Sequence, residues 1–322
     1  MVAHGYDAPR IETSVLLFAH RRRIEFINRL DKLPKRHKEA AYYAFPFRGP
    51  RAKDAFRYEI QNGIVNPAAS STPRPLGRAI GMLPGANRAW FSVQHWAAIE
   101  TPRISAAVMP LDAGLMTFGG IFRGRWPRHF AARRPAMFSW IMNNYWFTNY
   151  MPSQGGKFTF RYVLTSGHPT PPGSPARQAQ YARWSRIGWQ SATGFALDRI
   201  TTLDKTPPHQ GRLPAPQASF LRVNQPDIAL VTWKRAANRR GTILRLLETA
   251  GQSGVVRVRL PLWRLKSAAL CNAMEVDCRP TPVAGHELQI PYGPFAILTV
   301  RLHMARSGVR RAPGRRTGRH AR

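Results

Sequence analysis

The sequence predicts a mainly β protein, an antiparallel β-sandwich followed by a smaller β-sandwich unit. The first observation is strict alternation of apolar and polar residues in Lys157–Leu164 ("KFTFRYVL"), Val256–Leu260 ("VRVRL") and the end of "PFAILTVRLH". A period of two is typical of strands with one face in the core. The second is frequent interruption by 28 Pro and 25 Gly, which leaves short segments suited to antiparallel sheets. The third is an apolar content of 43%, enough for a continuous core.

Two proline-rich stretches, "SGHPTPPGSP" and "TPPHQGRLPAP", divide these strands, because proline lacks the donor that a sheet interior requires. Helix is scarce, and the best candidate is "ARQAQYARWSRIGW" between them. We therefore expect four parts. They are a large β-sandwich region at 1–175, a helical connector with a proline-rich linker at 176–216, a smaller C-terminal β unit at 217–304, and a disordered basic tail at 305–322.

The charge is strongly basic, with 49 Lys and Arg against 16 Asp and Glu and a formal net charge of +33. Any polyanion is attracted to such a chain. The tail contributes seven Arg and no carboxylate. The sequence contains no recognisable nucleic-acid module, and its aromatic residues fall inside strand patterns, so we do not expect nucleic acid as the partner.

The sequence contains only two cysteines, Cys271 and Cys278. Two buried thiols are the favoured interpretation, and a disulfide between them is the alternative. The N-terminal apolar run "SVLLFA" precedes "HRRR", which reverses the charge order of a signal peptide. No apolar run reaches membrane-spanning length. We therefore expect no membrane partner and, by default, a cytoplasmic location.

Few residues in the sequence could support catalysis. The chain has no HExxH, no zinc-spaced cysteine pair, no phosphate-binding glycine loop and no GxSxG, and its ten histidines are dispersed. Glu39, Glu59, Asp112 and Glu248 are the carboxylates in informative settings, but pairing with one of the many arginines is favoured over an acid/base role. The sequence thus predicts no catalytic residue, no metal ligand and no cofactor in this chain.

A carboxamide-rich and aromatic stretch, "NNYWFTNYMPSQGG", is the best candidate for ligand recognition. It carries eight carboxamide or aromatic residues and no charge in fourteen positions. Carboxamides satisfy hydroxyl groups, and aromatic rings cover apolar faces, which is the combination that sugars require. The alternative is ordinary sandwich core with asparagines that cap turns. The candidate substrate-binding residues in this stretch are Asn143, Asn144, Trp146, Asn149, Tyr150 and Gln154.

Two residues outside that stretch complete the candidate site. In "WFSVQHW", the core is expected to hold Trp90, Val93 and Trp96. His95 in the same segment could reach the surface. Arg245 in "TILRLLE" is expected to be a structural partner of a carboxylate such as Glu248, with an approach to the sugar as the alternative.

A set of motifs resembles one known family. In chain order these are "DKLPKRHKEAAYYAFPF", "YEIQNGIVNP", "MLPGANRAWFSVQHWAAI", "VMPLDAGL", "NNYWFTNYMPSQGGKFTFRYVL", "LVTWKRAANRRGTILRLLE" and "PYGPFAILTVRL". They resemble the C-terminal β-sandwich region of glycoside hydrolase family 38, the α-mannosidase family, over roughly Ile11 to Leu302. The departures are Gly114, where the family has proline, and Asn238, where it has an acidic residue.

The resemblance implies a galactose-mutarotase-like supersandwich without the catalytic barrel. In the family the barrel carries the aspartate nucleophile and a zinc ion, so zinc is implied only for that missing domain. The resemblance further implies carbohydrate (mannoside) binding, support of a hydrolytic site in mannose metabolism, and a separately encoded barrel or a glycan as partner. A free-standing carbohydrate-binding module is the alternative, and a basic nucleic-acid-binding protein is the third class. Whether this chain is an enzyme by itself stays open.

Overall fold

The computed structural model describes residues 1–5, 7–49, 55–70, 80–122, 127–144, 153–199 and 219–306. These residues form two compact units. The first holds the elements from β1 to α1 with two short segments, Glu248–Gln252 and Gly293–Ala296, and the second holds the rest of β14 to β22. Apart from the parallel pair β6 and β7, the paired strands run antiparallel, which confirms the predicted fold class.

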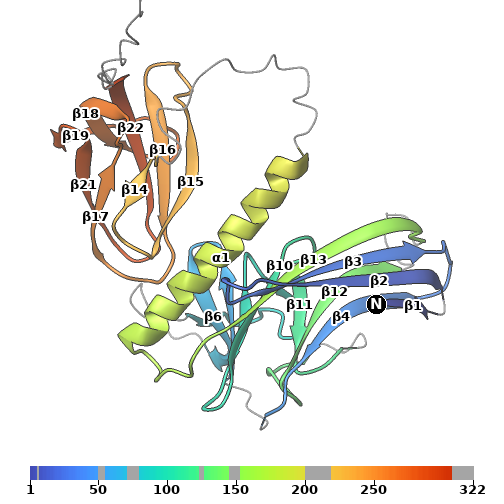
Figure 1. Ribbon diagram of the computed structural model, residues 1–322. Helices are drawn as coiled ribbons and strands as arrows, with labels where there is room; N and C mark the ends of the chain where they lie inside the picture. Colours follow the sequence, from blue (N-terminus) through green and yellow to red (C-terminus); the bar gives the residue numbers. More distant parts are fainter. Residues whose placement is uncertain are drawn as a thin grey trace, which may run out of the picture. The chain divides into compact units, whose positions relative to one another are not determined.

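The first unit contains two sheets and one helix (Figure 1). The strand order is β1-β2-β3-β13-β10-β9-β5-β6-β7 in the larger sheet and β4-β12-β11-β8 in the smaller one. Its elements are β1 (Val2–Gly5), β2 (Ala8–Leu17), β3 (Ile24–Lys32), β4 (Glu39–Pro46), β5 (Phe56–Ile60), β6 (Gly63–Ser70), β7 (Ile80–Met82), β8 (Phe91–Ser92), β9 (Ala97–Glu100), β10 (Ser105–Pro110), β11 (Leu115–Phe118), β12 (Ala136–Asn144), β13 (Gly156–Ser166) and α1 (Pro175–Arg199).

The second unit is also built from two sheets. Their strand orders are β14-β17-β21-β20 and β15-β16-β22-β18-β19. Alternate residues are buried along β17, where Val256 and Val258 are fully enclosed and Arg257 is exposed, as the alternation predicted. The strands are β14 (Arg222–Val223), β15 (Ile228–Arg235), β16 (Thr242–Glu248), β17 (Gly254–Arg259), β18 (Trp263–Cys271), β19 (Arg279–Thr281), β20 (Val283–Ala284), β21 (Glu287–Tyr292) and β22 (Ile297–Arg306). The predicted tail lies outside the described residues beyond Arg306.

Strand β13 is an interior strand of the larger sheet in the first unit. It lies between β3 and β10, and its Phe160 is in register with Asn28 on β3. Phe160 and Tyr162 point to the core, where their rings lie 5.9 Å from Tyr43 and 5.0 Å from Phe45, respectively. This strand has the apolar face predicted from "KFTFRYVL", and it joins the two sheets of the sandwich through aromatic contacts.

Helix α1 begins at Pro175, one residue before the segment predicted to be helical. The Ser174 hydroxyl accepts a hydrogen bond from the backbone N–H of Arg177 at 3.3 Å, and Pro175 occupies the first helical position. The helix extends to Arg199 and is longer than the segment predicted from its sequence. No helix in the described part of the chain combines the length and apolar character needed to cross a membrane.

The helix covers one face of the larger sheet in the first unit (Figure 1). Tyr181 and Trp184 from α1 pack with Trp96, Met109 and Val163 in one buried apolar cluster. The Trp96 and Trp184 rings meet edge to face at 5.2 Å. The end of β13 is therefore buried on both faces, by the sandwich core on one side and by the helix on the other.

A close backbone contact explains why glycine occupies position 114. A Cβ added there would lie 2.7 Å from the carbonyl oxygen of Val93, closer than side chains approach. The Val93 N–H donates to the Gly114 carbonyl at 2.9 Å, so the two backbones are held in contact. Glycine is required here because only a residue without Cβ allows this approach.

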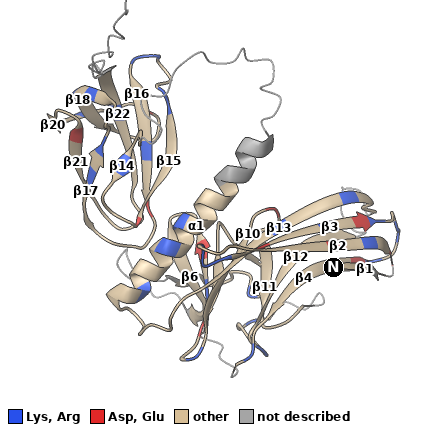
Figure 2. Ribbon diagram, in the orientation of Figure 1, with Lys and Arg blue, Asp and Glu red and all other residues tan. Residues whose placement is uncertain are grey.

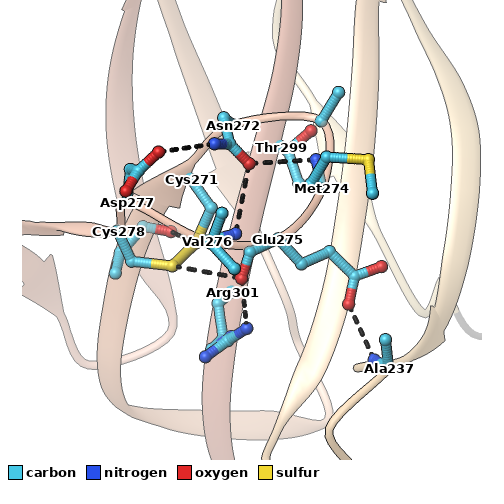
Figure 3. The surroundings of a disulfide bond; sticks show 12 residues. Ala237, Cys271, Asn272, Met274, Glu275, Val276, Asp277, Cys278, Thr299 and Arg301 are labelled. Atoms are coloured by element: carbon cyan, nitrogen blue, oxygen red, sulfur yellow. Dashed lines mark hydrogen bonds between the residues drawn. A yellow bond between two sulfur atoms is a disulfide. The ribbon is translucent and has the colours of Figure 1, made fainter.

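The two cysteines form a disulfide, which corrects the favoured prediction of two buried thiols (Figure 3). Strands β18 and β19 pair antiparallel with Leu270 opposite Arg279. In this register Cys271 and Cys278 are the next opposite pair, and their Cα atoms are 4.0 Å apart. A sequence spacing of seven shows no such hairpin register, which is why the pairing was only the alternative.

The hairpin loop closed by the disulfide has its own hydrogen-bond network (Figure 3). The Asn272 side-chain oxygen accepts from the N–H groups of Met274 and Val276 at 2.9 and 3.1 Å. The Glu275 carboxylate accepts from the Ala237 N–H at 2.7 Å, and the pKa of Glu275 is lowered first by this hydrogen bond and then by Lys234. The loop is therefore fixed both covalently and by its polar contacts.

Removing this disulfide is expected to destabilise the second unit. Cross-linking residues 271 and 278 closes a short loop, and the chain-entropy estimate for such a loop is about 2–3 kcal/mol. The Cys271→Ser/Cys278→Ser variant should therefore unfold at lower denaturant concentration than the oxidised protein. Adding a thiol reductant should destabilise the parent protein and leave the double variant unchanged. Equal stability of all four samples would contradict a structural role for the bond.

Candidate functional site

The candidate stretch at the end of β12 meets the loop between β3 and β4. Asn144 is in register with Glu39 on β4, and Gly156 is in register with Lys32 on β3. These registers bring both strand ends to the same rim of the first unit. We name the side chains of Asp7, Lys32, His37, Glu39 and Asn144 the rim cluster.

Lys32 and Asn144 both bind the same carboxylate oxygen in the rim cluster. Lys32 Nζ lies 2.7 Å from Glu39 Oε1, and Asn144 Nδ2 donates to that oxygen at 2.8 Å. Asn144 also donates to the Lys35 carbonyl at 3.2 Å. Lys32 is 6% exposed and Asn144 only 1%, so both polar groups are removed from water and held by partners. Asn144, predicted as a binding residue, is thus buried among polar groups.

His37 joins the two carboxylates of the rim cluster. Its Nε2 lies 2.8 Å from Asp7 Oδ2 and 3.5 Å from Glu39 Oε2. Asp7 is 7% exposed, whereas about half of the His37 side chain is exposed. The backbone carbonyl of Asp7 accepts from the Leu33 N–H at 2.9 Å. The turn before β2 is therefore joined to the β3–β4 loop by both its backbone and its side chain.

Gly155 explains how the two loops at this rim approach each other. A Cβ at Gly155 would lie 2.7 Å from the backbone nitrogen of Pro34. Glycine therefore permits the segment that leads into β13 to contact the β3–β4 loop directly. Within the quoted stretch, Asn143 and Gln154 are half-buried. Asn143 precedes Asn144 on the strand and so points to the opposite face of the sheet.

Three of the predicted binding residues, Trp146, Asn149 and Tyr150, lie outside the described residues. The other predicted residues belong to different networks or to different units. Asn144 belongs to the rim cluster, His95 to a separate network of the first unit, and Arg245 to β16 of the second unit.

His95 belongs to a polar network that attaches α1 to the sheet. Its Nδ1 shares a hydrogen bond of 2.8 Å with Glu59 Oε2. Ser185 on α1 donates to Glu59 Oε1 and accepts from Trp96 Nε1, both at 2.8 Å. The His95 ring packs edge to face on Trp189 at 4.6 Å. The carboxylate lies between the serine and the histidine, whereas nucleophile activation requires the histidine in the middle, so this arrangement is structural.

Arg245 does not pair with Glu248, which corrects one expectation. Its Nε donates to Thr299 Oγ1 at 3.2 Å and its Nη2 to the Ala273 carbonyl at 2.8 Å. The two residues are three apart on β16, so their side chains point to opposite faces. The Glu248 carboxylate instead accepts backbone N–H groups, including those of Ala250 and Gly251 at 2.7 and 2.8 Å. Burial raises the pKa of Glu248, and these hydrogen bonds act in the opposite direction.

The basic residues are distributed over both units, with one concentration beside α1 (Figure 2). Arg183 donates to Thr165 Oγ1 at 3.1 Å, and Thr165 donates to the Arg22 carbonyl at 2.7 Å. Burial lowers the pKa of Arg183, and repulsion from Arg22 and Arg186 adds to this effect. These three guanidinium groups concentrate positive charge and attract anions.

An aromatic groove of about 330 Å³ lies along strand β4 in the first unit. Phe26, Tyr43, Phe45 and Phe47 contribute its rings, and burial raises the pKa of Tyr43 to about 12. Strand β4 is the edge of its sheet in the described topology, so the groove opens between the two sheets at this edge. Flat apolar faces of this kind suit a sugar ring.

The sequence reasoning missed Asp7, Lys32 and His37 as members of one site. His37 lies in the loop directly before β4 and Glu39 is the first residue of β4, and this spacing of two lets both side chains reach Asp7 and each other. That signal was available. The sequence gives no such signal for Asp7, because Asp7 reaches the cluster only through the register of β1, β2 and β3.

Comparison with known proteins supports the resemblance. Residues 227–300 match a family described as "Glycosyl hydrolases family 38 C-terminal beta sandwich domain". A solved glycosyl hydrolase family 38 protein from Enterococcus faecalis matches 91% of this chain with a TM-score of 0.58 and 15% identity. An α-mannosidase from Enterococcus faecalis V583 matches 91% with a TM-score of 0.57 and 15% identity. No curated protein matches the chain.

The chain spans only 30% and 29% of the length of these two solved proteins. At this identity the structural match shows the fold alone. The family model is a separate match, and it covers residues 227–300. The match to the solved structures covers most of the chain. Residues 227–300 therefore match the family 38 C-terminal β-sandwich domain, and most of the chain shares its fold with part of these two solved proteins.

Proposed function

We propose that this chain is the C-terminal β-sandwich part of an α-mannosidase-like glycoside hydrolase. In this role it shapes or binds a mannose-containing glycan site, and a barrel on a separate segment or polypeptide performs the hydrolysis. The observation that carries the proposal is that 91% of this chain matches 30% of a family 38 protein. The family match to residues 227–300 supports the same assignment.

The contacts of the described carboxylates agree with this division of work. Retaining hydrolysis needs two carboxyl groups about 5–5.5 Å apart, one to attack the sugar and one to transfer a proton. Here Glu39 contacts Lys32, and Asp112 forms a bidentate pair with Arg161 at 2.7 and 2.9 Å. Glu59 is held by hydrogen bonds in the α1 network. These groups stabilise the sandwich through their partners, and the proposal assigns the chemistry to the barrel.

The purified chain is expected to show no turnover of an aryl α-mannoside, with or without Zn²⁺. We expect this lack of turnover because the proposal places the nucleophile and the metal in the barrel. Adding or co-expressing a family 38 barrel should restore turnover if the two parts associate, and circular dichroism should confirm that the sandwich alone is folded. Metal-dependent turnover that persists through further purification and follows the chain on a sizing column would contradict the proposal.

A second candidate is carbohydrate binding without a barrel, and the aromatic groove beside β4 favours it. Four rings line this groove, and Thr13 and Asn28 add polar groups at its wall. Calorimetry with manno-oligosaccharides distinguishes the two roles. Binding by the chain alone that is lost in Tyr43→Ala favours the second candidate, whereas binding that requires the barrel favours the first.

A further inference from the structure

Three atoms that commonly ligate metals converge in the rim cluster. They are Asp7 Oδ2, His37 Nε2 and Glu39 Oε2, and all lie within 4.8 Å of one another. We propose that the rim cluster binds one divalent transition-metal ion of the zinc type through these three atoms. The inference concerns metal binding by the sandwich and does not rest on the proposed function.

The separations between these atoms suit a shared ion. His37 Nε2 lies 2.8 Å from Asp7 Oδ2 and 3.5 Å from Glu39 Oε2. Nitrogen and oxygen ligands at about 2.0–2.2 Å from Zn²⁺ in tetrahedral arrangement are about 3.3–3.6 Å from each other. The separation between His37 and Glu39 already lies in this range, the separation between His37 and Asp7 must lengthen by about 0.5–0.8 Å, and water completes the coordination.

The second oxygen of each carboxylate already faces a supporting group. Glu39 Oε1 is bound by Lys32 Nζ at 2.7 Å and by Asn144 Nδ2 at 2.8 Å. Asp7 Oδ1 has Lys35 Nζ at 3.7 Å. Ligating carboxylates in metal sites are typically held in this way, with one oxygen on the ion and the other on an orienting partner.

An independent observation points to a missing ligand at this place. Asp7 is 7% exposed, and its Oδ2 has His37 Nε2 at 2.8 Å as a neighbour but accepts no well-aligned hydrogen bond from the described residues. The side-chain oxygen of Asn144, 1% exposed, also lacks a hydrogen-bond partner in the described part of the chain. A buried oxygen that lacks a well-aligned donor is incompletely satisfied, and a cation bound to Asp7 Oδ2 would supply the missing contact.

The nearby lysines set the expected strength and selectivity. Lys32 and Lys35 carry positive charge beside both carboxylates, so the site should be weaker than zinc sites built from cysteine. One imidazole with two carboxylates suits Zn²⁺, Co²⁺ or Ni²⁺ better than Ca²⁺, which takes six to eight oxygen ligands.

The test uses the full chain, freed of metal with a chelator. Calorimetric titration with Zn²⁺ and visible absorption with Co²⁺ should show one ion per chain that involves the rim cluster. His37→Ala should weaken this binding more than about tenfold, and Asp7→Asn, which keeps the shape of the side chain, should do the same. His20→Ala is the matched control, an exposed histidine of the same unit, and it should bind like the parent protein.

The outcomes separate a metal site from an ion-pair network. Circular dichroism establishes that each variant is folded, and Asp7→Asn provides the answer if His37→Ala does not fold. Loss of one bound ion in the folded rim variants and its retention in His20→Ala support the proposal. Absence of binding to the parent protein, or equal binding by the rim variants, overturns it and leaves Asp7, His37 and Glu39 as an ion-pair network.

Discussion

Replacing Trp184 with alanine is expected to lower the free energy of unfolding by about 3–5 kcal/mol. The side chain is fully buried, and its ring contacts Trp96 at 5.2 Å and Tyr181 at 5.8 Å. Its removal leaves a cavity between α1 and the larger sheet that these neighbours can fill only partly. Chemical denaturation followed by circular dichroism measures the loss.

Gln190→Ala is the matched control for this variant, because Gln190 is an exposed residue of the same helix. It should change stability by less than about 0.5 kcal/mol. Trp184→Phe should fall between the two, since it keeps part of the ring contact. If Trp184→Ala is as stable as Gln190→Ala, the helix does not pack on the sheet as described.

Replacing Glu59 with alanine is expected to cost a similar amount, about 3–5 kcal/mol. The side chain is 7% exposed, and the substitution removes the partner of both His95 and Ser185. Both groups would then be left buried with an unsatisfied donor. Thermal and denaturant unfolding measure this loss, and Glu59→Gln should lose less because it keeps one acceptor oxygen.

Glu12→Ala is the control for that experiment. Glu12 is a carboxylate in the same sheet, and its pKa is lowered first by a hydrogen bond from Arg10 at the protein surface. Its removal should change stability little, since exposed ion pairs are weak. A loss in Glu59→Ala no greater than that in Glu12→Ala would show that the His95 network is not a structural support.

The local parts of this fold could be predicted from the sequence. Alternation identified β13 and β17, and the segment "ARQAQYARWSRIGW" identified the first part of α1. These features depend on neighbours within a few residues, so a single sequence contains them. The motif resemblance extended the prediction to the sandwich architecture, which the family match and the fold comparisons confirm.

The candidate site was predicted only in part, because it depends on strand registers. Asn144 was identified from its carboxamide-rich surroundings, but its contact with Glu39 follows from the pairing of β12 with β4. The same limitation explains the cysteines, since Cys271 and Cys278 become neighbours only through the register of β18 and β19. Arg245 was assigned to Glu248 without applying the two-residue period of the strand that carries both.

The interior position of β13 has a consequence for the synthesis of this protein. The Asn28 side chain donates to the Phe160 carbonyl across a separation of 132 residues, and β13 fills the place between β3 and β10. While the chain leaves the ribosome, β3 and β10 therefore each keep an open edge until Gly156–Ser166 has emerged. Nascent chains that stall earlier expose those edges, and they depend on chaperones to avoid pairing with other chains.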